Sequence, residues 1–467
     1  MQPQSRALRL LPTLALLGAA WFSPDAAAQQ WGTYATPFAA DSLWNSRPVN
    51  PSFAPDVIPT SQYFPSVTAS AYSTGVFLAS TQDPPATVTG ASGSKGLYNT
   101  DDENYHDVTI PHWPAAAQPA TGTDGHADIV DPANNIIHSF WQLKQVGTQW
   151  TAAQYSWTKL DGRGWPDPAH YYQGARATGV PPSGGLIRTQ EVATKPTYYP
   201  HALAMSLTFN GLSANPTYVF PATSADANAA KLNTGTFPEG SLVMLPPDFD
   251  TSKITDGELR RVAETLKRYG AYIVDANTGT PFVIYVEIGS GYNLHPAGWS
   301  ATVGNELQLV RAALRRVTGA QSWIDGNGKT FTPTQNLNLL SMRGAWTLQS
   351  GSVGGAFNSW SQAVVFPATT TASVAVNRSN RGMNAVSWAK PVVGANYKLT
   401  ARTTGGGKLR FTVYDQSTGK WVIDTGYLDN GQSQVFAWTA NTPVLTLYAQ
   451  SGVGASSSVG GELIKAN

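Results

Sequence analysis

The chain has 467 residues, a formal net charge of +1 and no cysteine. Only 13% of its residues are charged, against about 25% in typical globular proteins, while 15 Trp and 19 Tyr are present. The balanced charge argues against nucleic-acid and anionic-membrane partners, and the lack of cysteine excludes cysteine nucleophiles, iron–sulfur clusters and Cys-ligated zinc.

Residues 1–28 are predicted to be a secretory signal peptide. Arg6 and Arg9 form a positive start, Leu8–Leu17 is mostly apolar, and Ala26–Ala28 offers a small-residue cleavage site. The apolar stretch is about ten residues, whereas a membrane span needs about 20. We therefore expect a secreted protein, extracellular or periplasmic, that is a monomer and contacts no membrane.

Residues 29–320 are predicted to form a β-rich catalytic module. Five prolines between Pro48 and Pro65 favour an extended segment that wraps a core. Alternating patterns then predict the strands Tyr105–Ile110, Ala127–Val130, Ile136–Leu143, Gln154–Trp157 and Ala202–Phe209. The turn residues Asp131–Asn135 make 124–143 a β-hairpin.

Helical patterns are scarce in this module. Three short helices are predicted: Asp226–Leu232, a segment from the capping box Thr255–Glu258 to Gly270, and Asn305–Val317, which Gly319 stops. Between the last two, Ala271–Asp275 and Pro281–Glu287 are predicted to pair as a second hairpin across the turn Asn277–Gly279.

Residues 321–338 are predicted to be a polar linker, and residues 339–467 a second module without helices. Its predicted strands are Leu339–Phe357, Ala363–Phe366, Ser373–Val376, Tyr397–Arg402, Lys408–Tyr414, Trp421–Asp424, Ser433–Trp438 and Val444–Ala449. The fold class is therefore mainly β: a jelly-roll-like or β-sandwich catalytic module with two or three short helices, followed by a smaller β-sandwich.

The second module resembles the jelly-roll carbohydrate-binding modules that follow many secreted glycanases. The matching segments are Asn338–Leu340, Ala395–Thr400, Leu409–Tyr414 and Val444–Tyr448. The resemblance implies binding of a glycan by exposed aromatic rings, for which Trp360, Trp388, Trp421 and Trp438 are the candidates. In the first module, Trp44, Trp141 and Trp165 are further candidates for stacking on a sugar.

The first module is similar to a group of exported bacterial proteins of unassigned function. The similarity rests on Ser42–Asn45, Gly122–Asp128, His138–Trp141, Gly184–Arg188, His201–Ala204, Phe237–Gly240 and Arg268–Tyr272. It implies one shared fold and brings no activity with it.

One candidate catalytic set is Asp124, His126 and Asp128. On a strand, these three side chains would share one face, and neighbouring carboxyls can differ in pKa enough to serve as acid and base. The alternative is that Asp124 and Asp131 cap turns and that His126 bonds to them.

The other candidate set is Arg188, Glu191, Tyr199 and His201. A lyase could use the arginine to neutralise a uronate and the tyrosine or histidine as base, whereas a hydrolase could use the glutamate as general acid. The alternative is a surface pair between Arg188 and Glu191.

No cofactor is expected to be required. The acidic run Asp101, Asp102, Glu103 and Asp107 is the segment suited to Ca²⁺, with a solvated turn as the alternative. Zinc would need three ligands to converge from His106, His112, His126 and His138.

These patterns lead to three hypotheses. The first is a secreted polysaccharide-degrading enzyme, a glycoside hydrolase that uses paired carboxylates. The second is a polysaccharide lyase that acts by β-elimination on a uronate-containing glycan, with a local basic groove around Arg163, Arg176 and Arg188. The third is a non-catalytic glycan-binding protein.

Overall fold

The computed structural model describes residues 30–333, 335–378, 382–383 and 386–466, so the predicted signal peptide lies outside the described residues. The chain divides into a leading segment, Met1–Gln30, and one compact unit, Trp31–Asn467. Within the described ranges, no helix has both the length and the apolar character of a membrane span.

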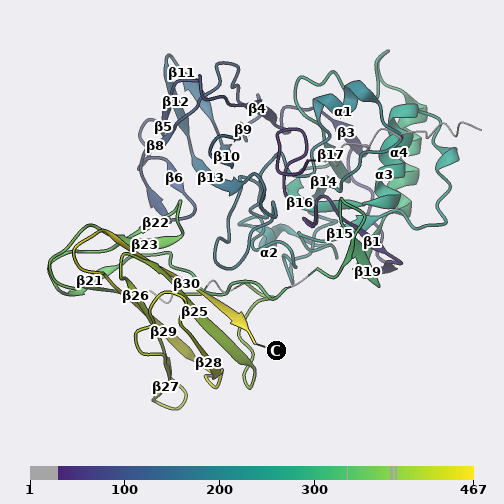
Figure 1. The fold of residues 1–467 in the computed structure, drawn as a ribbon. Helices are drawn as coiled ribbons and strands as arrows, with labels where there is room; N and C mark the ends of the chain where they lie inside the picture. Colours follow the sequence, from purple (N-terminus) through teal and green to yellow (C-terminus); the bar gives the residue numbers. More distant parts are fainter. Residues whose placement is uncertain (1–29, 334, 379–381, 384–385, 467) are drawn as a thin grey trace, which may run out of the picture. The chain divides into compact units, whose positions relative to one another are not determined.

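The prediction of a mainly β protein is confirmed (Figure 1). The described residues form six sheets and four α-helices: α1 (Thr189–Thr194), α2 (Ala229–Leu232), α3 (Gly257–Arg268) and α4 (Ala301–Ala313). A single 3₁₀ turn, Thr251–Lys253, precedes α3.

A seven-stranded mixed sheet organises the first module. Its order is β2 (Ser52–Phe53), β18 (Arg315–Gly319), β15 (Leu242–Met244), β16 (Ala271–Asn277), β14 (Leu203–Thr208), β17 (Phe282–Tyr285) and β3 (Ser66–Thr68). β14 pairs in parallel with β16 and antiparallel with β17. The predicted hairpin between the segments that became β16 and β17 is therefore wrong, because β14 lies between them.

Helices α3 and α4 cover one face of this sheet. Leu259 and Leu266 of α3 and Leu307 of α4 pack in one core with Met205 of β14 and Ile273 of β16. Burial of such side chains stabilises the fold by about 1.5–3 kcal/mol each.

The ends of the two long helices differ from the predictions. Helix α3 begins one residue later than the capping box suggested, because Asp256 rather than Thr255 accepts the N–H of Leu259 at 2.8 Å. Helix α4 ends at Ala313, and the residues predicted to be its last turn form β18, which pairs with β15 and β2.

A six-stranded sheet lies beside a smaller four-stranded one. The first has the order β4 (Gly75–Leu78), β9 (Ala127–Asp131), β10 (Ile136–Trp141), β13 (Gln154–Lys159), β6 (Tyr98–Asn99) and β7 (Asn104–Tyr105). The second has the order β11 (Lys144–Val146), β12 (Gln149–Ala152), β5 (Ala86–Gly90) and β8 (Val108–Ile110). The predicted hairpin of β9 and β10 is confirmed by the pairing of Asp131 with Ile136. The predicted strand from Tyr105 to Ile110 is split between β7 and β8.

The first half of the predicted linker belongs to the first module. Strand β19 (Ser322–Ile324) pairs with β1 (Arg47–Val49) and with β20 (Thr330–Phe331) in a three-stranded sheet. Strands β19 and β20 are therefore part of the first module's structure through β1, and this part of the chain is not a free linker.

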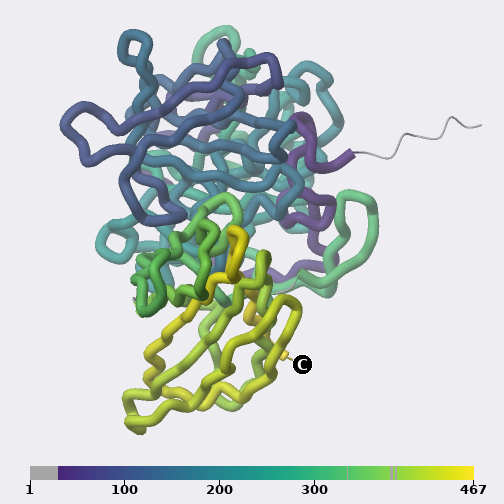
Figure 2. Tube along the Cα trace, turned by 60° about the vertical axis from the view of Figure 1, so that its left-hand side comes forward, coloured from purple at the N-terminus to yellow at the C-terminus, as the bar shows by residue number. Residues whose placement is uncertain are grey.

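The C-terminal β-sandwich is confirmed, with two five-stranded antiparallel sheets (Figure 2). One has the order β21 (Thr347–Ser350), β24 (Val374–Asn377), β29 (Pro443–Gln450), β26 (Lys408–Asp415) and β27 (Lys420–Asp424). The other has the order β22 (Ala356–Asn358), β23 (Ala363–Phe366), β30 (Ser457–Lys465), β25 (Asn396–Thr404) and β28 (Ser433–Ala437). The sequence patterns missed β30, whose centre is Gly460–Gly461.

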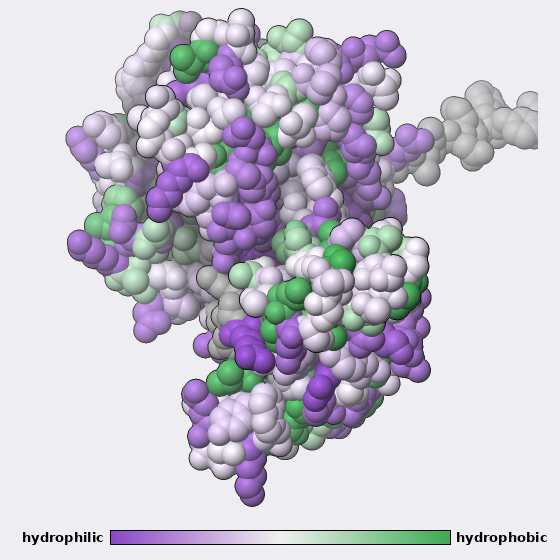
Figure 3. All heavy atoms as spheres, turned by 90° about the vertical axis from the view of Figure 1, so that its left-hand side faces the viewer, coloured by the Kyte–Doolittle hydropathy of each residue, from purple (hydrophilic) through white to green (hydrophobic). Residues whose placement is uncertain are grey.

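The surface agrees with the low charge of the chain. On the face drawn in Figure 3, hydrophobic residues form small separate patches, and hydrophilic residues gather in a band over the first module. On this face no single large apolar surface marks a binding site.

Gly185 provides a test of the packing around the first module's core. Its φ is +67°, and a Cβ built there would lie 2.4 Å from the ring of Trp44 and 2.7 Å from the backbone nitrogen of Ala204. We expect Gly185→Ala to lower the free energy of unfolding by more than about 2 kcal/mol, because backbone strain and steric overlap add. Gly289→Ala is the control, since its φ is +90° in open space; strain alone should cost about 1–2 kcal/mol. Urea unfolding of both variants checks this, and equal losses would contradict the steric contribution.

Candidate active site

A cavity of about 530 Å³ lies on the face of the seven-stranded sheet opposite α3 and α4. Alternate residues of neighbouring strands line it: Ser66 and Thr68 of β3, Ser206 of β14, Asp275 and Asn277 of β16, and Tyr285 of β17. Their neighbours in sequence, such as Val67, Met205 and Ile284, point into the helix-covered core. The period of two along each strand thus supplies one apolar face and one polar face.

A β-bulge in β16 brings Asp275 onto the polar face. Met205 of β14 is paired with Ile273, but the next residue, Ser206, is paired with Asp275, so Val274 is an extra residue. The carbonyl of Val274 accepts the hydroxyl of Thr178 at 3.1 Å. Because a bulge changes which side chains share a face, Asp275 joins Ser206 in the pocket.

A buried guanidinium, Arg176, holds Asp275 in place. Its Nη1 donates to Asp275 Oδ2 at 3.1 Å and to the carbonyl of Tyr72 at 3.3 Å. Its plane lies 4.0 Å from the ring centroid of Tyr285. Arg176 is 2% exposed, whereas the Asp275 side chain is 18% exposed, so the carboxyl reaches the cavity and the cation lies behind it.

Two more carboxyl groups approach Asp275 from behind the cavity. The backbone N–H of Ala276 donates both to Asp226 Oδ2 at 2.9 Å and to Asp275 Oδ1 at 3.1 Å. Glu239, which is fully buried, accepts the N–H of Asp226 at 3.3 Å. Three acidic side chains therefore surround one stretch of backbone.

Burial and like charge set the protonation of this group. The pKa of Asp275 is raised to about 7: burial is the main cause, Asp226 and Asp124 add to the rise, and Arg176 opposes it. Burial also raises the pKa of Asp226, with a contribution from Asp124. The pKa of Glu239 is raised well above its ordinary value by burial and by the two neighbouring aspartates. A carboxyl held neutral near pH 7 can act as a general acid.

Asp124 completes the pocket from the six-stranded sheet. It lies in the loop before β9 and lines the cavity together with Asp275. The indole of Trp141, another predicted site residue, donates to Asp124 Oδ1 at 3.4 Å. These two predicted residues therefore lie together at the cavity.

The other members of the first predicted set do not reach this cavity. Strand β9 begins at Ala127, so the alternation that would place Asp124, His126 and Asp128 on one face does not apply. His126 is buried with Nδ1 at 3.4 Å from the carbonyl of Phe140, and burial and Arg176 lower its pKa.

Asp128 and Asp131 are held by the backbone and by turn residues. Asp128 is fully buried and accepts the N–H of Ser183 at 2.7 Å. Burial raises its pKa to about 6, although its bonds to Ser183 and Ser139 oppose the shift. Asp131 accepts the side-chain amide of Asn134 at 2.7 Å, which is the turn role considered for it.

The second predicted set is brought together, but its polar groups bond to one another. Arg188 Nε donates to Glu287 Oε2 at 2.9 Å, and the N–H of Arg188 donates to Glu191 Oε2 at 2.9 Å, at the start of α1. His201 Nε2 lies 3.1 Å from the same Glu191 oxygen, and its Nδ1 lies 2.9 Å from the carbonyl of Ala202. This is a buried ion-pair network rather than the surface pair considered as an alternative.

Tyr199 is separate from that network's polar contacts. Its ring is fully buried in the core beneath α3 and α4, and burial raises the pKa of its hydroxyl. A base in a lyase needs access to substrate and a lowered pKa. Tyr199 has neither, and its surroundings are those of a core residue.

The ionisation of His201 and Glu191 leads to a stability prediction. Burial would raise the pKa of Glu191, but His201 and Arg188 together outweigh burial, and the net shift is downward. Burial would lower the pKa of His201, but Glu191 outweighs it and the net shift is upward. The contribution of Glu191 to stability is therefore fully present above about pH 4.3 and is lost as pH falls through its lowered folded-state pKa. The contribution of His201 is fully present below about pH 6.5 and is lost as pH rises through its raised folded-state pKa.

We expect His201→Gln to lower the free energy of unfolding by about 1–3 kcal/mol at pH 5.5 and by less at pH 8.5. The control His106→Gln disrupts a more exposed pair with Asp102 and should cost less than about 1 kcal/mol. Denaturant unfolding at the two pH values measures the difference, and a loss for His201→Gln that is independent of pH would count against the charged pair.

The tryptophans predicted to stack on sugars have three different environments. Trp44 and Trp165 are each 1% exposed and stack on one another with centroids 4.8 Å apart. They offer no ring face to a ligand, and the structure assigns them to the core. Trp438 is likewise 1% exposed in the core of the sandwich. Trp421, at 61% exposed, presents its ring to solvent.

Trp360 and Trp388 contact the first module. The ring of Trp360 stacks on that of Trp157 with centroids 5.4 Å apart, although Trp360 remains 44% exposed. Trp388 donates to the carbonyl of Ala222 at 2.7 Å and meets the ring of Phe220 edge-on at 5.0 Å. Intramolecular packing thus occupies part of both rings.

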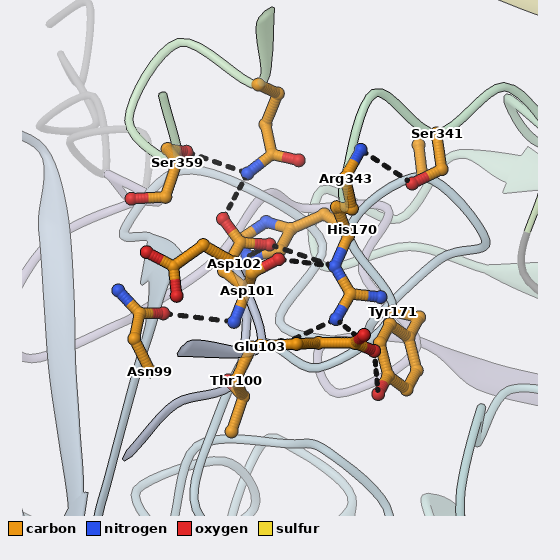
Figure 4. A network of polar contacts seen from close by, with 12 residues as sticks. Asn99, Thr100, Asp101, Asp102, Glu103, His170, Tyr171, Ser341, Arg343 and Ser359 are labelled. Atoms are coloured by element: carbon orange, nitrogen blue, oxygen red, sulfur yellow. Dashed lines mark hydrogen bonds and ion pairs between the residues drawn. The ribbon is translucent and has the colours of Figure 1, made fainter. Parts of the chain in front are cut away.

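The acidic run considered for Ca²⁺ forms part of the same contact (Figure 4). Arg343 Nη2 donates to the carbonyl of Thr100 at 2.6 Å and to Glu103 Oε1 at 3.0 Å. Asp101 accepts the amide of Gln362 and lies 3.4 Å from His170. Burial raises the pKa of Asp101 to about 7, against the effect of Arg343.

These carboxylates are turned toward protein donors, and Asp102 bonds to His106 at 2.7 Å. Across the part of the chain that the structure describes, no group of three or more His, Asp or Glu side chains is arranged to hold a metal ion.

Several residues that line the cavity or lie behind it were not among the predicted site residues. Asp275 appeared only as the end of a predicted strand, and Asp226, Glu239 and Tyr285 were not singled out for chemistry. Arg176 was noted only as part of a basic groove. No local spacing marks these residues, because a bulge and the pairing of five separate chain segments bring them together.

Comparison with known proteins gives partial similarities only. No family model matches the chain, and no curated protein matches it. TmCBM61 in complex with beta-1,4-galactotriose is 10% identical, with 26% of this chain and 88% of that chain covered and a TM-score of 0.18. Accessory secretory protein 1, 2 and 3 in Streptococcus pneumoniae is 9% identical, with 29% and 99% covered and a TM-score of 0.20.

The Glycosylation Associate Protein (Gap123) complex from Streptococcus agalactiae is 13% identical to this chain, with a TM-score of 0.18. The similarity covers 27% of this chain and 46% of that chain, so less than half of that protein is spanned. Scores of this size carry no argument about function, and the site is judged below on its own geometry.

Proposed function

We propose that this protein is a secreted glycoside hydrolase that cleaves a neutral polysaccharide in the cavity lined by Asp124 and Asp275. The observation that carries the proposal is the convergence on one cavity of two carboxyl groups, one from the loop before β9 and the other from β16. One of them, Asp275, has a pKa raised to about 7 by burial and by its acidic neighbours. Glycosidases commonly use two carboxyl groups, one as acid and the other as nucleophile or base.

The two carboxyl groups take different roles in this proposal. Asp275, neutral near pH 7, gives its proton to the glycosidic oxygen as the bond to the anomeric carbon breaks. In this proposal Asp124 is the second carboxyl group, which either attacks the anomeric carbon as nucleophile or activates the water that does so. Water supplies the hydroxyl of the new reducing end, and a proton returns to Asp275. Arg176 acts as a positioning residue that fixes the orientation of Asp275.

The lining of the cavity favours a neutral substrate. Besides the two acids, its polar groups are hydroxyls and amides, such as those of Ser206, Thr280 and Asn277, and none of its lining residues is Lys, Arg or His. A uronate would meet negative charge without a cation to neutralise it. This weighs against the lyase hypothesis, whose arginine and histidine candidates bond to Glu287 and Glu191 instead.

The direct test is release of reducing ends from a panel of neutral polysaccharides, with absorbance near 235 nm recorded in parallel for lyase products. We expect Asp275→Asn and Asp124→Asn each to lower kcat by about 10²–10⁴-fold. Asp248→Asn, at an exposed position outside the cavity, should retain activity. All variants should unfold at similar temperatures. Full activity in both cavity variants would refute the proposal, and glycan binding without product release would indicate a non-catalytic glycan-binding protein.

The pH dependence of the reaction gives a second test. A general acid works in its protonated form, so kcat/KM should fall as pH rises through about 7, the pKa of Asp275. Asp226→Asn removes a neighbouring negative charge that raises this pKa, so the alkaline limb should move to lower pH. A half-unit shift would lower the active fraction about threefold above the pKa. An unchanged limb would argue against Asp275 as the acid.

A further inference from the structure

Exposed aromatic side chains lie on both sides of strand β3, next to the cavity. Tyr63 and Phe64 precede the strand and are 56% and 41% exposed, and Tyr72 follows it and is 50% exposed. Trp299, just before α4, is 60% exposed. Figure 1 shows β3, β17 and α4 in the same part of the first module.

The grouping of these rings is unusual for this chain. Among the described residues, seven Phe, Tyr and Trp side chains are strongly exposed, and four of them belong to this group. The remaining three are Tyr105, Trp360 and Trp421. Exposed apolar side chains that cluster at the edge of a pocket mark binding surfaces more often than isolated ones do.

The group is continuous with the cavity. Tyr72 is itself a lining residue. The N–H of Tyr63 donates to the carbonyl of Gly279 at 2.8 Å, and Gly279 lies between Thr278 and Thr280, which both line the cavity. A ligand that leaves the cavity past these threonines therefore meets the Tyr63 ring.

Packing from behind fixes the outer rings. Phe64 and Trp299 meet edge-on with centroids 5.0 Å apart, and His295 stacks on Trp299 at 4.6 Å. Gly304 of α4 leaves room for the indole, because a Cβ there would lie 2.8 Å from a Trp299 ring atom. Rings that are ordered before binding lose little conformational freedom when a ligand stacks on them.

The chemistry of these segments suits an uncharged ligand. Residues 61–73 and 289–300 contain no Lys, Arg, Asp or Glu. Aromatic rings present a flat apolar surface, and Tyr and Trp add a polar group at the edge. A pyranose ring has the matching character, with apolar C–H faces and hydroxyls around its rim.

We propose that Tyr63, Phe64, Tyr72 and Trp299 form a binding platform for a neutral polysaccharide chain and direct that chain into the cavity. This deepens the proposed function by naming where the rest of the polymer lies. It also transfers the main glycan-stacking role from the C-terminal sandwich, where the sequence had placed it, to the first module.

Affinity gel electrophoresis of the full mature chain tests the platform. The probes are xylan, β-1,4-galactan and glucomannan, with polygalacturonate as the anionic comparison, and Asp275→Asn is present in every protein so that the polymer is not cut. We expect retardation by at least one neutral polymer, and Trp299→Ala and Tyr63→Ala should each weaken it about five- to tenfold. Tyr105→Ala, which removes a ring that is 46% exposed and lies outside the group, should leave it unchanged.

Three results would overturn the platform. The first is that no neutral polymer retards the protein, and the second is that Tyr105→Ala weakens binding as much as the platform variants do. The third is that Trp421→Ala loses binding while Trp299→Ala keeps it, which would locate the site in the sandwich. Thermal unfolding of each variant confirms that the fold is retained. If binding depends on Trp299 but Asp275→Asn still cleaves the polymer, the platform is kept and the proposed function is rejected. If binding does not depend on Trp299 but Asp275→Asn abolishes cleavage, the platform is rejected and the proposed function is kept.

Discussion

The candidate site depends on one buried cation. Arg176 is almost fully enclosed, and a buried charge must be paired or it is expelled at high cost. Its partners come from different parts of the chain: the carboxyl group of Asp275, the ring of Tyr285 and the carbonyl of Tyr72. By bonding to Nη1 and packing against the guanidinium, these groups fix the wall of the cavity, while Nε and Nη2 are buried without a hydrogen-bond partner. The same cation limits how far the pKa of Asp275 rises, so it influences both the shape and the protonation of the site.

The network around Arg188 shows why residue types alone do not define a catalytic site. It contains an arginine, two glutamates and a histidine, the same kinds of groups that catalysis uses. Here Glu287 and Glu191 accept hydrogen bonds from Arg188, and His201 bonds to Glu191. Around Asp275, in contrast, three carboxyl groups lie close together, only Asp275 pairs with a cation, and Asp275 lines a cavity. Surplus charge next to an opening is what distinguishes the candidate catalytic group from the structural one.

The contact between the sandwich and the first module changes how the sandwich can be understood. Arg343 and Trp360 make polar and aromatic contacts with the first module, so part of the aromatic surface expected to bind glycan is used within the chain. Trp421 remains exposed on the sandwich. The greater concentration of exposed rings lies beside the cavity, in segments that no pattern in the sequence had marked. A glycan could therefore be held by the module that is proposed to cut it.

The sequence by itself determined the mainly β class, the β9–β10 hairpin, the start of α3 to within one residue and most strands of the sandwich. These features depend on alternation, turn residues and capping, which act over a few neighbouring residues. Tertiary structure alone decided that β14 lies between β16 and β17, that residues 322–331 pair with the first module and that Asp275 faces Asp124. Strand order is set by pairing between distant segments, and a bulge breaks the period of two on which the choice of face was based. Asp124 could be selected from the sequence because it belongs to a segment with several titratable residues close together. Asp275 could be recognised as a site residue only from the assembled sheet.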